Sequence, residues 1–137
     1  MYFFLFIFTK TPAVMKLIPI FKVRDMHIAL RHYTEVLDFV MTDPDDTVDS
    51  PVIDLGNGDA AFQITTHESE KLFGSVANVW VDDVDAQFAK YKARGLNTSG
   101  KQNSPVEQGP FDQTWGRREF YVKDPDGNTL RFVALIK

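Results

Sequence analysis

Apolar residues follow two spacings along the chain, and these spacings alternate in a fixed order. Residues 16–23 form an apolar run typical of a strand, and residues 26–37 carry apolar side chains at helical spacing. Asp25 stands where the N-cap of this helix belongs. Short strands are predicted at 40–41, 51–55 and 60–66, the last two joined by the hairpin sequence Gly56-Asn57-Gly58-Asp59.

The same order returns in the second half of the chain. A strand is predicted at 75–81, a helix from the acidic cap at 82–85 to Gly95, a polar loop at 97–110, and strands at 115–123 and 129–136 around a turn at 124–128. A unit repeated after about sixty residues indicates internal duplication. We therefore expect an α+β fold of two βαβββ modules, about 16–67 and 75–137. Together they should form a curved mixed sheet with an open cleft and with helices on its outer face.

The first fifteen residues precede this pattern and form a separate N-terminal extension. Residues 2–8 are all apolar, and five of them are aromatic. The run is too short to span a bilayer. Three interpretations remain open: an added strand or arm, a fragment of a signal or anchor, or an upstream extension of a domain that begins at Met15.

Charge and composition narrow the class of protein. The net charge is -4, which disfavours a nucleic-acid partner. The chain has no cysteine, which excludes disulfides, thiolate zinc sites and cysteine nucleophiles. This composition suits the cytoplasm, which is the location we expect. No Ser/His/Asp arrangement and no phosphate-binding glycine loop can be identified.

Three segments carry a resemblance to a known family. They are 23–39, which begins VRDM and ends VLDF, 79–86 (VWVDDVDA) and 115–128 (WGRREFYVKDPDGN). In this order and spacing they resemble the vicinal-oxygen-chelate superfamily of glyoxalases, bleomycin-resistance proteins and extradiol dioxygenases. The closing hairpin is most similar to the bleomycin-resistance-like branch. The resemblance covers residues 16–136 and implies a homodimer whose clefts are completed across subunits.

Metal-dependent members of this family use His and Glu, one from each of four strands. The motifs place those positions at Ile18, Gln63, Val76 and Arg131. Two of these side chains are aliphatic and one is a cation, whereas a divalent ion requires carboxylate or imidazole ligands. His27, His32 and His67 are isolated in the sequence and offer no substitute. We therefore expect neither a metal nor another cofactor.

Alternation along the strands predicts which side chains line the open face. If Phe62, Leu130 and Phe120 face the helices, their neighbours face the cleft. The candidate ligand-binding residues are Gln63, Asn78, Trp80, Trp115, Glu119, Tyr121 and Arg131, with an expected charge pair between Glu119 and Arg131. Trp80 and Tyr121 could instead be core residues, and Arg131 could pair with a carboxylate. No catalytic residue can be assigned.

These features favour a metal-free small-molecule binding protein that sequesters a drug or toxin. The alternative is a metal-dependent lyase, isomerase or dioxygenase of the same superfamily with a non-standard site, so enzymatic activity is uncertain and disfavoured. The ligand is expected to be aromatic or cationic. The acidic stretch from Asp43 to Asp59 contains no Lys or Arg and would attract a cation, although such runs are usually solvated loops. We expect no nucleic-acid or membrane partner.

Overall fold

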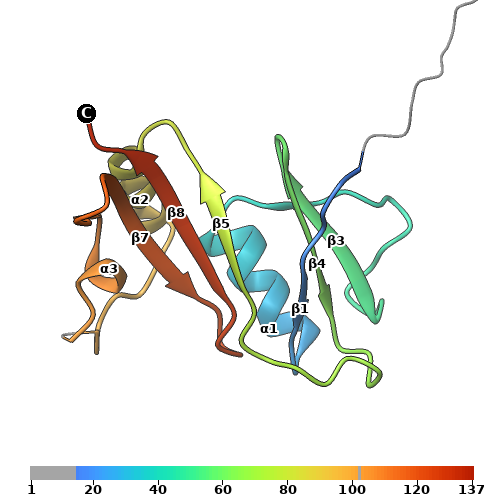
Figure 1. Cartoon of the computed structure of the whole chain (residues 1–137). Coiled ribbons are helices and arrows are strands. Elements are labelled where there is room, and N and C mark those ends of the chain that lie inside the picture. Colours follow the sequence, from blue (N-terminus) through green and yellow to red (C-terminus); the bar gives the residue numbers. More distant parts are fainter. Residues whose placement is uncertain (1–14, 102) are drawn as a thin grey trace, which may run out of the picture.

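Two sheets lie side by side in the computed structural model, which describes residues 15–101 and 103–137 (Figure 1). The first module contains β1 (Ile20–Lys22), α1 (Met26–Arg31), η1 (His32–Val36), β2 (Val40–Met41), β3 (Val52–Asn57) and β4 (Ala60–Thr65). The second contains β5 (Val76–Trp80), α2 (Val84–Ala93), α3 (Pro105–Gln108), β6 (Phe111–Asp112), β7 (Arg117–Lys123) and β8 (Thr129–Leu135). The N-terminal extension, apart from Met15, lies outside the described residues. Among the described helices, none has the length and apolar character needed to cross a bilayer.

Both modules have the same strand order, which confirms the predicted α+β architecture and its duplication. The sheets run β1-β4-β3-β2 and β5-β8-β7-β6, so each strand has a counterpart in the other module. In each module the first strand in the sequence pairs in parallel with the last one, β1 with β4 and β5 with β8. The other neighbouring strands are antiparallel. The strands form two separate hydrogen-bonded sheets and not one continuous sheet, because β1 and β5 pair only within their own modules.

The two predicted helix starts are confirmed by their caps. Asp25 accepts a hydrogen bond from the Ile28 N–H at 3.0 Å, and Asp83 accepts one from the Ala86 N–H at 3.0 Å. The first helix is not α-helical to its predicted end. It widens into the π-helical η1, where the Leu37 N–H donates to the His32 carbonyl at 3.0 Å. Arg94 donates to the carbonyl of Leu37 at 2.6 Å, so a residue at the end of α2 caps this turn.

The prediction of a loop at 97–110 was wrong in part. It contains the short helix α3, and it is followed by the two-residue strand β6, which pairs with β7. A strand of two residues is too short to show alternation, so β6 could not be predicted from hydrophobic spacing. The next strand begins at Arg117 and not at Trp115, because Gly116 turns the chain with a φ of 85°.

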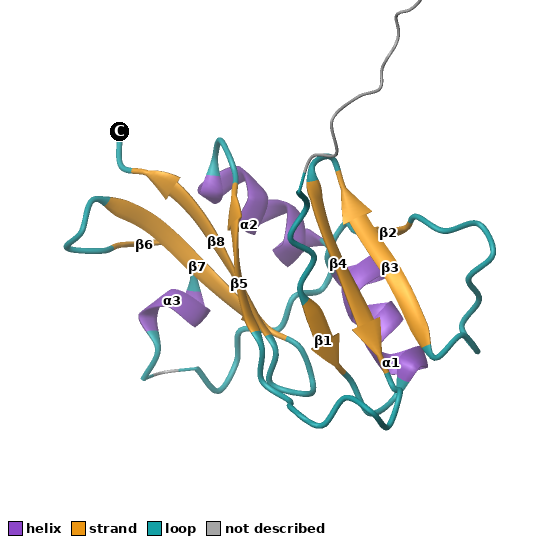
Figure 2. Ribbon diagram, turned by 45° about the vertical axis from the view of Figure 1, so that its right-hand side comes forward, coloured by secondary structure: helices purple, strands orange, loops and turns teal. Residues whose placement is uncertain are grey.

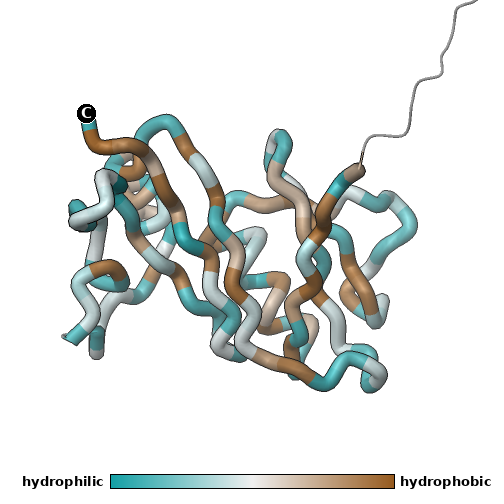
Figure 3. The backbone as a smooth tube through the Cα atoms, viewed as in Figure 1, coloured by the Kyte–Doolittle hydropathy of each residue, from teal (hydrophilic) through white to brown (hydrophobic). Residues whose placement is uncertain are grey.

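A single core joins the two modules on the helix side of the sheets. Figure 2 shows α1 and α2 behind the strands. In Figure 3, hydrophobic and hydrophilic stretches alternate along the strands. The side chains predicted to face the helices, Phe62, Phe120 and Leu130, are buried in this core. Ile64, Val122 and Phe132, which share the same strand faces, are buried with them. The rings of Phe120 and Phe132 stack with centroids 4.8 Å apart. The opposite faces of the sheets are therefore left for other contacts.

The turn at 124–128 connects the modules as well as the strands. Asp124 Oδ1 accepts the N–H groups of Asp126 and Asn128 at 2.8 and 2.9 Å, and Gly127 has a φ of 85°. The Tyr33 hydroxyl donates to Asp124 Oδ2 at 2.7 Å, and Asn128 Nδ2 donates to the Lys22 carbonyl at 2.8 Å. Both contacts reach into the first module, so this turn has a structural role.

Candidate functional site

Five of the seven candidate residues lie on one face of the second sheet. The register places Asn78 beside Arg131, and Arg131 beside Tyr121 on the following strand. Trp80 and Glu119 occupy the next row of the same face, on either side of Val133. Since side chains alternate across a strand, these residues point away from the helices. Trp80 is 54% exposed, so on this face it is not a core residue.

Glu119 is the buried centre of this face. It is 4% exposed, and its two carboxylate oxygens accept different donors. The Trp115 indole N–H donates to Oε2 at 3.2 Å, and the Tyr121 hydroxyl donates to Oε1 at 2.9 Å. Burial raises the pKa of Tyr121, and the hydrogen bond and charge of Glu119 raise it further, so the phenol remains a donor. Trp115 thus joins the site from the turn before β7.

The expected charge pair between Glu119 and Arg131 was wrong. No ion pair joins these two residues, because Tyr121 occupies the intervening position. The Arg131 guanidinium lies over the Tyr121 ring, 4.7 Å from its centroid, while the hydroxyl of the same ring is bound to Glu119. Tyr121 therefore links the two charged groups without their making direct contact.

A second stacked guanidinium was missed by the sequence analysis. Arg117 lies over the Trp80 ring at 4.8 Å from the centroid, across β8. The signal was available, since residues 117, 119 and 121 share one face of β7 by alternation. Val133 shares this face and lies in the row between Trp80 and Glu119, but it is only 1% exposed.

Gln63 does not join the other candidates, because it lies on the first sheet. It occupies β4 between Ile20 and Asp54, and its Nε2 donates to Asp54 Oδ1 at 2.7 Å. Gln63 lines a hollow of about 540 Å³ together with Ile18 and Ile20. The two candidate amides, Gln63 and Asn78, therefore lie on different sheets.

A larger groove of about 620 Å³ lies between the sheets. Its lining is largely apolar and includes Leu17, Ile18, Phe62, Val76, Asn78 and Trp80. This volume falls within the range of about 300–1,000 Å³ that is typical of small-molecule sites. The groove shares Trp80 and Asn78 with the open face of the second sheet, so the two features are continuous.

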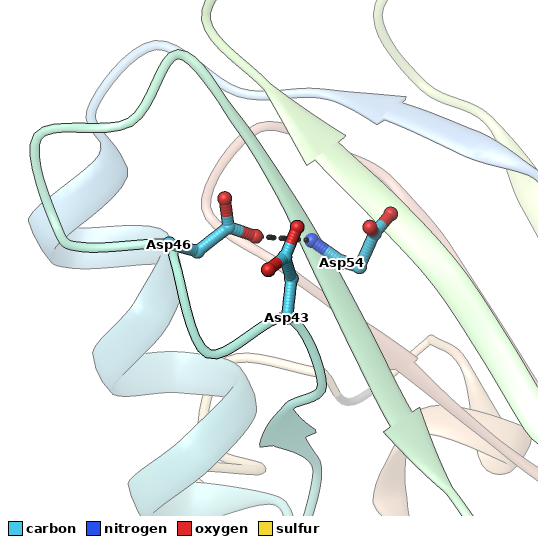
Figure 4. A group of neighbouring side chains, drawn as sticks. All are labelled: Asp43, Asp46 and Asp54. Atoms are coloured by element: carbon cyan, nitrogen blue, oxygen red, sulfur yellow. Dashed lines mark hydrogen bonds between the residues drawn. The ribbon is translucent and has the colours of Figure 1, made fainter.

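Three carboxylates gather beside the first sheet, as Figure 4 shows. Oxygen atoms of Asp43, Asp46 and Asp54 lie within 4.8 Å of one another. Their hydrogen bonds order the surrounding loop and strand: Asp43 accepts from the Asp45 N–H at 2.9 Å, and Asp46 accepts from the Asp54 N–H at 3.3 Å. The loop is held by these contacts, and its negative charge is concentrated at one edge of the open face.

The four positions to which the resemblance assigns metal ligands carry side chains that do not fit a divalent ion. Ile18 and Val76 have no donor atom, and Arg131 carries a positive charge. Gln63 offers a single neutral amide oxygen, and its amide nitrogen donates to Asp54. Within the described residues, the carboxylate cluster of Figure 4 is the one group with the composition of a cation site, and no histidine belongs to it.

Comparison with known proteins gives a consistent result at the level of the family and the fold. The model of the family described as Glyoxalase/Bleomycin resistance protein/Dioxygenase superfamily matches residues 19–132. No curated protein sequence matches the chain.

Solved structures are similar over nearly the whole chain. The bleomycin resistance determinant encoded on transposon Tn5 is 20% identical, with a TM-score of 0.70 over 90% of this chain and 100% of that one. TioX from Micromonospora sp. ML1 is 21% identical, with a TM-score of 0.68 over 90% and 100%. The bleomycin-binding protein of Streptomyces verticillus, in complex with copper(II)-bleomycin, is 22% identical, with a TM-score of 0.65 over 89% and 97%. At these identities the likeness shows the fold alone.

Proposed function

The chain belongs to the glyoxalase/bleomycin resistance protein/dioxygenase superfamily, and we propose that it binds a small molecule, such as a drug or toxin, non-covalently in its cleft. Binding would sequester that molecule without altering it chemically. One observation carries this proposal: the groove of about 620 Å³ is continuous with an open sheet face on which Trp80 is 54% exposed. An apolar hollow with a few placed polar groups is typical of small-molecule sites. Neighbours that bind bleomycin support the same class of function.

The proposal is for binding without a metal ion. Its support is the donor set: Ile18, Val76 and Arg131 stand at three of the four positions where the family places ligands. Protein prepared without chelator should contain well under one equivalent of zinc, manganese, iron or nickel. A full equivalent whose removal abolishes activity or stability would instead favour a metal-dependent lyase, isomerase or dioxygenase.

The proposed ligand carries an aromatic surface. Trp80 and Trp115 are 54% and 61% exposed, so ring surface is open to a ligand on both, although Arg117 lies over one face of Trp80. The carboxylates of Figure 4 favour a positive group on the part of a ligand that extends to the first sheet. The ligand-binding roles of Gln63, Asn78, Glu119, Tyr121 and Arg131 and a cytoplasmic location are parts of the same proposal.

We also propose that the chain forms a two-fold homodimer through its open faces. Val76, Trp80, Phe111 and Leu135 are 52%, 54%, 43% and 67% exposed. Apolar exposure of this kind on one side of a sheet is typical of a surface that meets a partner. The contact would be two-fold and self-complementary, with the same patch of each subunit meeting its copy.

Ligand binding is tested by thermal shift with a panel of aromatic antibiotics that includes bleomycin. A ligand that binds only the folded state at 100 times its Kd adds about 2.7 kcal/mol to the free energy of unfolding. Trp80→Ala should weaken binding by about tenfold or more, because truncation of a central aromatic residue costs about 2 kcal/mol. Phe73→Ala is the matched control, since Phe73 is an exposed ring (38%) in the linker. Equal weakening by both variants, or no stabilisation by any compound, would refute the proposal.

A further inference from the structure

The open face of the second sheet presents two guanidinium groups stacked on aromatic rings. Arg131 lies over Tyr121 and Arg117 lies over Trp80. Neither has a carboxylate oxygen within 4.0 Å among residues 15–101 and 103–137, whereas Arg118 on the same strand forms ion pairs with Asp85 and Asp112. The two stacked arginines are therefore cations that the described part of the fold does not neutralise by direct contact.

The charge of this face is positive, although the protein as a whole is acidic. Glu119 is its buried carboxylate, and hydrogen bonds from Trp115 and Tyr121 occupy both of its oxygens. Arg117 and Arg131 contribute two positive charges beside this single negative one. A guanidinium stacked on a ring keeps the N–H donors of its edge free to bind an oxyanion.

The Tyr121 ring, on which Arg131 stacks, is held in place by hydrogen bonds. The Tyr121 hydroxyl is fixed by Glu119, and Glu119 is fixed in turn by the Trp115 indole N–H. Asn78, the neighbour of Arg131 on β5, adds an exposed amide on the other side. A donor pair on a platform that is already ordered loses little conformational entropy when a ligand binds.

We propose that this face recognises the carboxylate of a planar aromatic acid, with Arg131 as the oxyanion-binding residue. This inference rests on the proposed function and specifies its ligand: the aromatic body occupies the groove beside Trp80, and the carboxylate meets the edge of Arg131 next to Asn78. A positive group on the ligand would be repelled here and would have to extend toward the carboxylates of the first sheet. The second sheet thus selects for a negative group at the position where metal-dependent relatives carry a ligand to a cation.

The test compares two probes of the same shape, 2-naphthoate and the neutral 2-naphthamide, by isothermal titration calorimetry with the full chain. We expect the carboxylate to bind about tenfold more tightly, because a charge-assisted hydrogen bond is lost with the amide. Arg131→Gln should abolish this preference while leaving the amide affinity unchanged. Arg31→Gln is the matched control, because Arg31 is exposed at the end of α1 and belongs to the opposite side of the sheets.

The outcomes separate this inference from the proposed function. If the amide binds as tightly as the carboxylate, or if Arg131→Gln keeps the preference, the carboxylate site is refuted while small-molecule binding stands. If neither probe binds, the inference is refuted for this ligand class, and the antibiotic panel decides the proposed function independently. A fall in the carboxylate preference as salt is raised would support the ionic contact.

Discussion

Comparing two Tyr→Phe variants, one at the turn at 124–128 and one away from it, should show that this turn connects the modules. Tyr33 and Tyr91 are each 1% exposed, and each donates its hydroxyl to a carboxylate at 2.7 Å. Substitution by Phe removes the same single atom from both. The two carboxylates differ in their surroundings, and this difference predicts unequal effects on the free energy of unfolding.

Asp124, the partner of Tyr33, is 5% exposed and has no Lys, Arg or His nitrogen within 4.0 Å among the described residues. Its other donors are the N–H groups of Asp126 and Asn128 and the side-chain amide of Asn128. Tyr33→Phe leaves a buried charge with one donor fewer, which costs about 2 kcal/mol. For a domain of this length, that corresponds to a fall in Tm of about 8 °C.

Asp38, the partner of Tyr91, can replace the lost bond more easily. Its side chain is 16% exposed and keeps the Lys90 ammonium at 3.0 Å. Water can reach the oxygen that Tyr91 leaves, so Tyr91→Phe should cost about 1 kcal/mol or less. Urea unfolding followed by tryptophan fluorescence measures both values. A Tyr33→Phe variant within about 0.5 kcal/mol of the parent protein, or a larger loss for Tyr91→Phe, would refute this account of the turn.

Acid stability, backbone conformation and assembly can each be tested by one substitution. Burial raises the pKa of Asp38, but hydrogen bonds from Tyr91, Lys90 and Gln87 outweigh it and hold that pKa below its ordinary value. The ionised carboxylate therefore stabilises the fold at neutral pH and stops doing so as pH falls through the lowered pKa. Asp38→Asn should show a shallower loss of stability below about pH 4, and parallel curves would contradict this. Gly127→Ala should lower the free energy of unfolding by about 1 kcal/mol, because its φ of 85° strains any other residue; an unchanged urea midpoint would count against it. Sedimentation at micromolar concentration should give twice the mass of one chain, and Leu135→Asp on the open face should shift it toward monomer. A monomeric parent protein would exclude the proposed dimer.

The fold could be predicted because its signals are local and repeated. Asp25 and Asp83 cap their helices where the sequence placed them, and the apolar positions of the central strands predicted the core face. The failures occurred where local signals are weak or where a distant residue decides. The π-helical end of the first helix is capped by Arg94, which lies far along the chain at the end of α2.

The candidate site was predicted in part, for the same reason. Alternation placed Asn78, Glu119 and Arg131 on one face, and the register confirmed it. Alternation does not tell which partners a side chain chooses. The sequence therefore predicted a pair of opposite charges, whereas Tyr121 binds both groups and keeps them apart. Whether these residues bind a ligand remains a prediction.

The helix side of the sheets holds the fold together, whereas the open side carries the candidate site, and this separation explains why family resemblance says little about the ligand. The contacts that hold the modules together lie on the helix side or at the turn: Tyr33 with Asp124, Asn128 with Lys22, and Arg94 with η1. None of them uses Trp80, Arg117 or Arg131, whose side chains stack on the open face. Substitutions there change the charge and shape of the site while leaving the core and its connections intact. A sequence can therefore keep the motifs of the family, because the motifs build the scaffold, and still carry isoleucine, glutamine, valine and arginine at the four positions where the resemblance places metal ligands.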